Sequence, residues 1–385
     1  MIKITDKTKC CGCTACVNVC PTKAITMHSD QLGFLYPIVE ESMCIDCGRC
    51  IKVCAFHNEY DRSLNLPYPV AYAVRHKDSN EVATSRSGAA FIAIADWALS
   101  HDGVVYGAGY ADHFRVIHKR AESKQECFEF KGSKYVQSDL NTVFTQVKKD
   151  LASGKIVLFS GTPCQTAALN SFVGAKYRSN LYLVDIVCHG VPSPFIWRDY
   201  LQYIENKYGK RVISLSFRDK SELGWAAHRE SFTFDDKKIY RNTYTYLFYE
   251  HIMFRPSCSK CPYTNMTRPS DLTCADFWGW EKTDVTINAD DRGISLLLCN
   301  TDKGVKLFDT ITGVLNVKEV ALSNCVQPNL LHPSIPNKNA AKFERDYSSR
   351  GFLYVARRYG DLGWRYFVQR FIQKCRTVIR ILFKK

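Results

Sequence analysis

The feature that most constrains this chain is a cysteine spacing that occurs twice near its N-terminus. The first run is followed by Pro21 and reads Cys10-x2-Cys13-x2-Cys16-x3-Cys20. The second run repeats the spacing as Cys44-x2-Cys47-x2-Cys50-x3-Cys54. Such a run places three thiolates on one tight loop and a fourth at the start of a helix, an arrangement that binds an iron–sulfur cubane. The first sixty residues are therefore predicted to carry electrons.

The repeated run resembles that of bacterial two-cluster ferredoxins, in which the fourth cysteine of each run ligates the other cluster. By this rule one 4Fe-4S cluster is assigned to Cys10, Cys13, Cys16 and Cys54, and the other to Cys44, Cys47, Cys50 and Cys20. Zinc is the alternative, because paired CxxC units also form tetrahedral zinc sites. Ala55 replaces the usual proline after the second run, which removes a turn preference but no ligand. Cys11 falls outside the spacing and is expected to be a bystander.

Composition indicates the cellular compartment, and the motifs leave several enzyme classes with little support. The N-terminal sequence MIKITDKTKC has no apolar signal-peptide core, and no run of about 18 apolar residues could span a bilayer. We therefore expect a cytoplasmic protein whose eighteen cysteines stay reduced. No P-loop, GxGxxG motif or nucleophilic triad is evident, which gives hydrolase and kinase functions little support.

Residues 1–58 form the predicted ferredoxin module. The chain after it alternates between apolar runs and helix-like stretches. The polar segment 59–69 contains two prolines and is predicted to be a linker into a larger domain, 70–345. Expected strands cover 155–161, 180–190 and 211–217, and expected helices cover 165–172 and 194–209. This alternation predicts the α/β class, a mixed sheet with flanking helices preceded by a small α+β dicluster ferredoxin domain.

Two cysteines follow neighbouring predicted strands, and two more form a pair. Cys164 opens a helix after one strand, and Cys188 closes the next, where α/β sheets bind ligands. Cys258-x2-Cys261 lies further along the chain. Singly, these could be buried packing residues, an idle pair or half of a zinc site. Together they are a full ligand set for a third cluster.

These residues carry a family resemblance. The motifs GTPCQ, CHGVPSP, GSKYVQS and the Cys258/Cys261 pair followed by RPSDLTCADFWGW resemble the beta subunits of coenzyme F420-reducing hydrogenases and F420-dependent dehydrogenases. The resemblance runs from about residue 68 to about residue 345. It implies a flavoprotein that binds FAD beside one 4Fe-4S cluster and exchanges a hydride with a deazaflavin or another conjugated ring. It also implies that Cys164, Cys188, Cys258 and Cys261 hold that cluster.

The resemblance further implies where FAD binds. The matching residues are Ser87, Gly88, Gly132, Ser133, Lys134, Tyr135 and Gln137. A glycine permits close backbone approach, and a lysine and hydroxyls suit the pyrophosphate or the flavin ring. The alternative for 132–137 is a surface turn leading into a strand. The family usually has a second glycine after Gly88, where this chain has Ala89. Asp276 also matches, and the remaining cysteines are expected to be packing residues: Cys127, Cys274, Cys299, Cys325 and Cys375.

Two functions from different classes follow. In the first, the protein is an oxidoreductase that passes electrons from a ferredoxin-type donor through three 4Fe-4S clusters to FAD and on to coenzyme F420 or another conjugated substrate, or in reverse. In the second, it is a non-catalytic electron-transfer subunit that serves a separate enzyme. His189 is a candidate to tune a cluster or relay a proton, with a satisfied loop residue as the alternative.

The C-terminal segment differs from the rest of the chain. Residues 341–385 contain twelve Lys/Arg and three Asp/Glu, so they supply +9 of the net charge of +14. Within residues 346–385, predicted to be a basic amphipathic helix, apolar residues recur at near-helical spacing: Trp364, Phe367, Phe371, Val378 and Leu382. Such a helix suits the anionic inner face of a membrane or an acidic partner. The alternative is a helix packed on the domain. No recognition motif for nucleic acid accompanies the charge.

Overall fold

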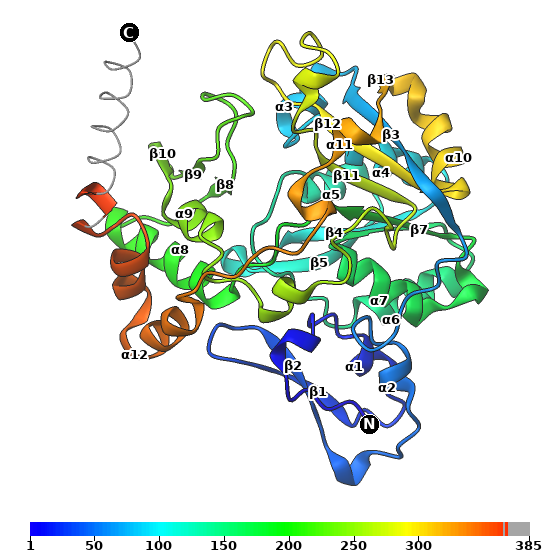
Figure 1. The fold of residues 1–385 in the computed structure, drawn as a ribbon, viewed down its shortest axis with the longest axis horizontal. Coiled ribbons are helices and arrows are strands. Elements are labelled where there is room, and N and C mark those ends of the chain that lie inside the picture. The colour runs from blue at the N-terminus through cyan, green and yellow to red at the C-terminus, as the bar shows by residue number, and fades with distance from the viewer. Residues whose placement is uncertain (365, 369–385) are drawn as a thin grey trace.

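The structure of the protein is a computed structural model, which describes residues 1–364 and 366–368. Figure 1 shows a small N-terminal module below a large twisted sheet with helices on its faces, and a mainly helical lobe to one side. The α/β class predicted from the sequence is confirmed, with a mixed sheet and flanking helices that follow a small N-terminal module of helices and a hairpin. Within the described residues, no helix is both long enough and apolar enough to cross a membrane.

The large sheet has the strand order β13-β3-β12-β11-β7-β6-β4-β5. Its middle strands form the parallel run β11-β7-β6-β4, and the outer strands pair antiparallel. The parallel strands end at the same edge of the sheet, which is where α/β proteins bind ligands. The strands are β3 (Asn65–His76), β4 (Val104–Tyr110), β5 (Val116–Ala121), β6 (Val157–Gly161), β7 (Leu181–Ile186), β11 (Leu272–Asp276), β12 (Ser295–Thr301) and β13 (Leu315–Glu319).

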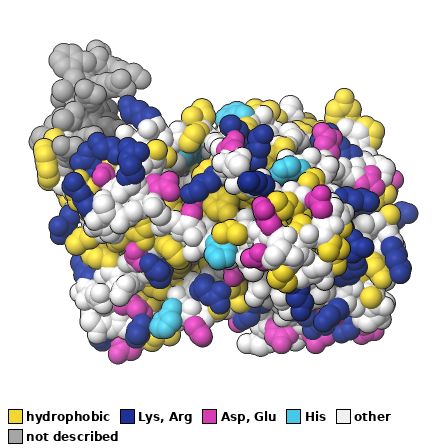
Figure 2. Space-filling view, turned by 90° about the horizontal axis from the view of Figure 1, so that it is seen from below, with side chains coloured by type: hydrophobic (Ala, Val, Ile, Leu, Met, Phe, Trp, Pro, Cys, Tyr) yellow, Lys and Arg dark blue, Asp and Glu magenta, His cyan; other side chains and the backbone are white. Residues whose placement is uncertain are grey.

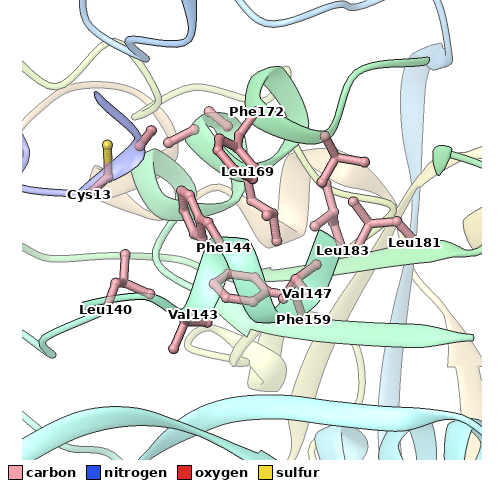
Figure 3. Close-up of a cluster of buried hydrophobic side chains, with 14 of the residues drawn as sticks. Cys13, Leu140, Val143, Phe144, Val147, Phe159, Leu169, Phe172, Leu181 and Leu183 are labelled. Carbon is pink, nitrogen blue, oxygen red and sulfur yellow. The ribbon is translucent and has the colours of Figure 1, made fainter. Parts of the chain in front are cut away.

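Both faces of this sheet are covered, so the central strands are apolar on both sides. In β6, Val157 and Phe159 face α6 (Val143–Ala152) and α7 (Pro163–Val173), whereas Leu158 packs toward α4 (Ala90–Ser100) and α10 (Asp302–Ile311). Figure 3 shows the first of these cores, with Cys13 of the N-terminal module at its edge. The sheet core and the ferredoxin module are therefore continuous.

The N-terminal module consists of two short helices and a hairpin. Helices α1 (Ala15–Val19) and α2 (Arg49–Lys52) each follow a cysteine loop, and strands β1 (Ile25–Ser29) and β2 (Leu35–Val39) pair antiparallel. Asn18 fixes the module on the loop before α6, because its side-chain amide donates to the Asn141 carbonyl at 2.7 Å. The Tyr263 hydroxyl donates to the Ala55 carbonyl at 2.5 Å. These contacts join the module to the large domain over a broad face.

A second lobe packs around an aromatic core that also includes Leu32 and Phe34 of the N-terminal module. It comprises a three-stranded antiparallel sheet and three helices: β8 (Ser214–Ser216), β9 (Glu230–Thr233), β10 (Lys238–Arg241), α8 (Pro194–Tyr208), α9 (Thr243–Tyr249) and α12 (Ala340–Tyr359). The short helices α3 (Ser79–Thr84), α5 (Lys124–Cys127) and α11 (Leu322–Cys325) lie around the large sheet.

The observed boundaries differ from the expected ones in two places. The expected linker 59–69 is only partly a linker, because β3 begins at Asn65 and pairs with β12 from there. The expected C-terminal helix 346–385 is not continuous, because α12 runs from Ala340 to Tyr359 and the chain is helical again at residues 364 and 366–368 after a break. Of its predicted apolar face, Trp364 and Phe367 are 70% and 62% exposed, and the other three residues lie outside the described residues: Phe371, Val378 and Leu382.

Candidate functional site: three cysteine sites and a large cavity

The two cysteine runs fold into matching loops. A left-handed residue begins the short helix of each run, Thr14 (φ 60°, ψ 3°) before α1 and Gly48 (φ 70°, ψ −4°) before α2. Two residues earlier, Gly12 and Asp46 also have positive φ, at 69° and 48°. The same backbone shape therefore recurs where the same spacing recurs, which turns three thiols of each run toward one point.

The second-cluster site combines three cysteines of the second run with one of the first. A small cavity near the module surface is lined by Cys20, Cys44, Cys47 and Cys50. Cys20 ends α1, and Cys50 lies in α2. Cys47 is exposed to solvent. The structure thus brings together the set expected from the crossover rule, at an accessible position.

The first-cluster site is deeper. Cys10, Cys13, Cys16 and Cys54 are all buried. Burial, together with the neighbouring Cys13 thiolate, raises the pKa of Cys54 to about 11. Burial and the thiolates of Cys13 and Cys10 likewise raise the pKa of Cys16. Such thiols resist ionisation unless a metal compensates the charge, because buried anions are costly.

The predicted third-cluster cysteines line a single cavity. Cys164 lies in the first turn of α7 after β6, and Cys188 follows the parallel strand β7. Cys258 lies in the 3-10 helix Pro256–Lys260, and Cys261 ends it. The backbone amide of Val191 donates to the Cys258 Sγ at 3.4 Å. Four cysteines from three separate segments therefore surround one space.

The four thiols differ in charge preference. Burial raises the pKa of Cys258 to about 12 and also raises the pKa of Cys188. Hydrogen bonding from Cys11 lowers the pKa of Cys164. Within the described residues no three His, Cys, Asp or Glu side chains gather tightly enough for a single metal ion. A cubane needs a wider set, since each thiolate binds its own iron.

The position of Cys11 in the structure was not predicted from the sequence. It is buried, lines the third-cluster cavity, and belongs to the same apolar core as Cys13 and Cys164. Its thiol hydrogen-bonds with both of these neighbours, which raises the pKa of Cys11. The expected bystander therefore lies between the first-cluster site and the third-cluster site. Its direct adjacency to the run was the one available signal.

A much larger cavity, about 540 Å³, adjoins the third-cluster cavity. The two share residues of the loop after β7, from Cys188 to Val191. Its volume lies within the range of about 300–1,000 Å³ that is usual for small-molecule and cofactor sites. Position 190 of this loop has no room for a side chain, because a Cβ there would sit 2.6 Å from the Phe254 ring. This loop, together with Thr162 and Gln165, therefore forms the wall that the two cavities share.

Five of the seven residues expected to contact FAD line the large cavity: Ser87, Gly132, Ser133, Lys134 and Tyr135. Gly88 and Gln137 lie elsewhere. Gly88 packs against β3, where a Cβ would sit 2.2 Å from the Val74 carbonyl oxygen. Gln137 instead contacts the ferredoxin module and donates to the Cys11 carbonyl at 2.7 Å. Ala89 lines the cavity in a left-handed conformation (φ 63°) that ordinarily favours glycine.

The large cavity is rich in cationic side chains. Burial lowers the pKa of Lys134 to about 7, and its ammonium donates to the Lys131 carbonyl at 3.1 Å without pairing with any carboxylate of the described residues. Burial also lowers the pKa of Arg86 to about 10, which leaves its guanidinium positive at neutral pH, whereas His228, with a pKa lowered to about 4, is neutral there. A bound phosphate would supply the missing negative charge. The lining therefore fits the pyrophosphate of FAD.

An aromatic wall faces these cations and was missed by sequence reasoning. Trp278 stacks on Trp225 with ring centroids 4.4 Å apart, and the Arg218 guanidinium lies 5.3 Å from the Trp278 ring. Arg218 also pairs with Asp276. Of these four residues, only Trp278 and Asp276 belong to a motif that the sequence analysis singled out. Trp225 and Arg218 come from a separate segment of the chain, so their contacts with the motif could not be predicted from spacing. Planar aromatic surfaces of this kind suit a conjugated ring.

The comparisons with known proteins agree with this division. Residues 9–58 match a family model described as a 4Fe-4S dicluster domain. Residues 154–322 match the model for the C terminus of the coenzyme F420 hydrogenase/dehydrogenase beta subunit. A ferredoxin-type protein, NapH of Haemophilus influenzae, is 37% identical over 70 residues, which are 16% of this chain and 24% of that protein. The chain thus spans about a quarter of that relative.

A solved structure also resembles the fold. A chain of the F420-reducing [NiFe] hydrogenase complex from Methanosarcina barkeri superimposes with a TM-score of 0.49 and 14% sequence identity. The superposition covers 76% of this chain and 96% of that chain.

Proposed function

Because residues 154–322 match the C-terminal model of the coenzyme F420 hydrogenase/dehydrogenase beta subunit and residues 9–58 match a 4Fe-4S dicluster domain, we propose that this chain is an iron–sulfur flavoprotein oxidoreductase. Its substrate would be a deazaflavin such as coenzyme F420 or another conjugated ring, and its protein partner a ferredoxin-type donor. The reaction can run in either direction, because the potentials of 4Fe-4S clusters span about −700 to +450 mV.

The observation that carries the proposal is the spatial order of the cavities. An exposed cysteine site is followed by a buried one, then by the third cysteine cavity, and that cavity shares a wall with the 540 Å³ cavity. Clusters supply single electrons, and FAD, when bound, would interconvert single electrons with a hydride. A plain electron carrier needs no large cavity at the end of the series, so this order favours the enzyme over the non-catalytic subunit.

The protein's own residues would bind, orient and shield the ligands. Lys134 and Arg86 place positive charge in the large cavity, where it would hold the cofactor's phosphates. Trp278 offers a flat surface, and the Arg218–Asp276 pair fixes the direction of the Arg218 guanidinium beside it. The apolar majority of the lining would exclude water, which protects a hydride from loss to solvent.

Electrons would enter at the surface of the ferredoxin module. The second-cluster site lies there, and three apolar side chains near its cysteines are exposed: Met43, Ile45 and Ile51. Figure 2 shows that Lys, Arg, Asp and Glu side chains are interspersed with apolar ones on the face that includes this module. A mixed surface with exposed apolar residues suits a transient redox partner.

Anaerobic purification with cofactor analysis tests the proposal. The holoprotein should release FAD on denaturation and contain about twelve irons per chain, from three 4Fe-4S clusters. Lys134→Met should lower the FAD content, because it removes the buried cation without changing the size of the side chain greatly. The control Lys306→Met changes an exposed lysine on α10 and should retain FAD. Iron without flavin would instead support the electron-transfer subunit.

Two cysteine variants test the predicted crossover. Cys54→Ala should remove the cluster of the buried site, although Cys54 belongs to the second run. Cys20→Ala should remove the cluster of the exposed site. Each variant should lose about four irons. Reduction of the remaining clusters by a bulky protein donor, compared with dithionite, would distinguish the exposed site from the buried one, and the opposite assignment would contradict the crossover.

A further inference from the structure

Arg255 is a buried cation without a carboxylate partner. Its side chain is 1% exposed, and no Asp or Glu in the described part of the chain forms an ion pair with it. The other deeply buried arginines do have such partners, since Arg178 pairs with Asp271 and Arg268 with Asp185. A buried charge that lacks a counter-ion is strongly destabilising. The fold therefore calls for a negative charge near Arg255 that no carboxylate supplies.

The side chain of Arg255 reaches into the ferredoxin module. Its Nε donates to the Cys10 carbonyl at 2.7 Å, and its Nη2 donates to the Leu35 carbonyl at 2.8 Å and to the Cys10 Sγ at 3.6 Å. Its Nη1 donates to the Gln137 Oε1 at 2.9 Å, and the guanidinium lies 4.3 Å from the centre of the Tyr36 ring. All of these acceptors are neutral apart from Cys10 Sγ, which is an anion once it is a thiolate.

The backbone of Arg255 belongs to the other side of the junction. Its amide donates to the Val191 carbonyl at 2.9 Å, in the loop that separates the third-cluster cavity from the large cavity. Its carbonyl accepts from the amide of Cys258 at 3.0 Å. Arg255 also lines the third-cluster cavity. One residue therefore contacts a cysteine of the buried ferredoxin site and the loop of the third site.

We propose that Arg255 is the counter-charge of the first 4Fe-4S cluster and sets the reduction potential of that cluster, which it couples to the third site. The inference rests on the three-cluster function proposed above. A cluster ligated by four thiolates is anionic and gains one more negative charge when it accepts one electron. A buried cation and a hydrogen bond to a ligand sulfur stabilise the reduced form, because cluster potentials depend on net charge and on hydrogen bonds to sulfur. Arg255 thus acts as a positioning residue.

The test is a redox titration of the anaerobic holoprotein with dithionite as the reductant, followed by electron paramagnetic resonance. Arg255→Gln should lower the reduced-to-oxidised ratio of the first cluster about tenfold at a fixed ambient potential, which equals about 59 mV for a one-electron couple. Arg255→Lys keeps the charge but loses the planar fork, so the ratio should fall about threefold. The exposed second cluster is an internal reference and should not change. Cys47→Ser, which removes a ligand of that reference, assigns the signals.

Arg178→Lys is the matched control, because it alters a buried arginine that pairs with Asp271 away from the clusters. It should leave all three potentials unchanged. An unchanged first-cluster potential in Arg255→Gln, with full iron content, would overturn the role of Arg255 and leave the proposed function standing. If Arg255→Gln fails to fold, a first-cluster potential in Arg255→Lys equal to that of the wild type would still overturn the part of the proposal that rests on the hydrogen bond to the ligand sulfur. If the wild-type holoprotein contained no 4Fe-4S clusters, the proposed function would be overturned and the inference with it.

Discussion

Gly12 offers a direct test of how tightly the ferredoxin module is docked. It has a positive φ of 69°, and a Cβ at this position would lie 2.8 Å from Arg255 Nη1 and 3.1 Å from Gln137 Nε2. The Arg255 guanidinium cannot move aside freely, because carbonyls of Cys10 and Leu35 and the Gln137 amide hold it. Gly12→Ala should therefore introduce two separate costs, one from the backbone and one from the close contact.

Gly48→Ala isolates the backbone cost. Gly48 has almost the same φ, 70°, but a Cβ there would meet nothing within 4 Å. The left-handed conformation costs an alanine about 1–2 kcal/mol at either position. Overpacking against Arg255 adds about 1–3 kcal/mol for Gly12→Ala only. The two variants should thus differ by about 1–3 kcal/mol, which is a large share of a typical folding free energy of about 5–15 kcal/mol.

Hydrogen exchange measured by mass spectrometry reports the opening free energy of the module without requiring reversible unfolding. Amides of α1 should lose about 5- to 150-fold more protection in Gly12→Ala than in Gly48→Ala, since each 1.4 kcal/mol is a factor of ten. Iron content should be measured alongside, so that the comparison uses fully loaded protein. Equal loss of protection in the two variants would refute the claim that Gly12 is required by the approach of Arg255.

Three further predictions follow from other parts of the molecule. Changing both Cys258 and Cys261 to alanine should lower the iron content from about twelve to about eight per chain, and an unchanged content would contradict the third site. Burial raises the pKa of Glu230 from 4.5 to about 7. The protonated form is favoured by folding, so this stabilisation is fully present below pH 4.5 and is lost as the pH rises through about 7, by about 3 kcal/mol in all. Glu230→Gln should flatten that decline in urea unfolding measured from pH 5 to 8. Deleting residues 365–385, which hold seven Lys/Arg and no Asp/Glu, should abolish low-salt binding to anionic liposomes if each cation near the surface contributes about 1 kcal/mol, and equal sedimentation of both chains would exclude a membrane role for the tail.

Sequence reasoning succeeded where the determinants are local. The spacing of the two cysteine runs predicted which thiols would gather, because each loop is short and its left-handed residues follow from that spacing. The apolar run 155–161 and the stretch 194–209 closely match β6 and α8 for the same reason, since periodicity within a segment reports burial of that segment.

Long-range contacts account for what was missed. The strand β3 lies between β13 and β12, partners more than 200 residues away, so part of it was assigned to a linker. Arg255 meets Cys10 across 245 positions of sequence, and Gln137 meets Cys11 across 126. No periodicity or spacing encodes such pairs. Gln137 was assigned to the flavin site because its neighbours in the motif lie there, whereas its own side chain points to the opposite side of the segment.

The continuity between the module and the sheet core bears on how the protein matures in the cell. Ala15 and Val53 are buried against a surface that includes Phe144 and Leu169, and the Ala55 carbonyl is capped by Tyr263. During translation, the first sixty residues leave the ribosome before Phe144, Leu169 and Tyr263 have been synthesised. The nascent module therefore has its apolar underside in water while synthesis continues, and its inner thiols are open to oxidation during that interval. Insertion of the inner cluster should accordingly be most efficient after release of the full chain, with the peripheral cluster loaded independently of that timing.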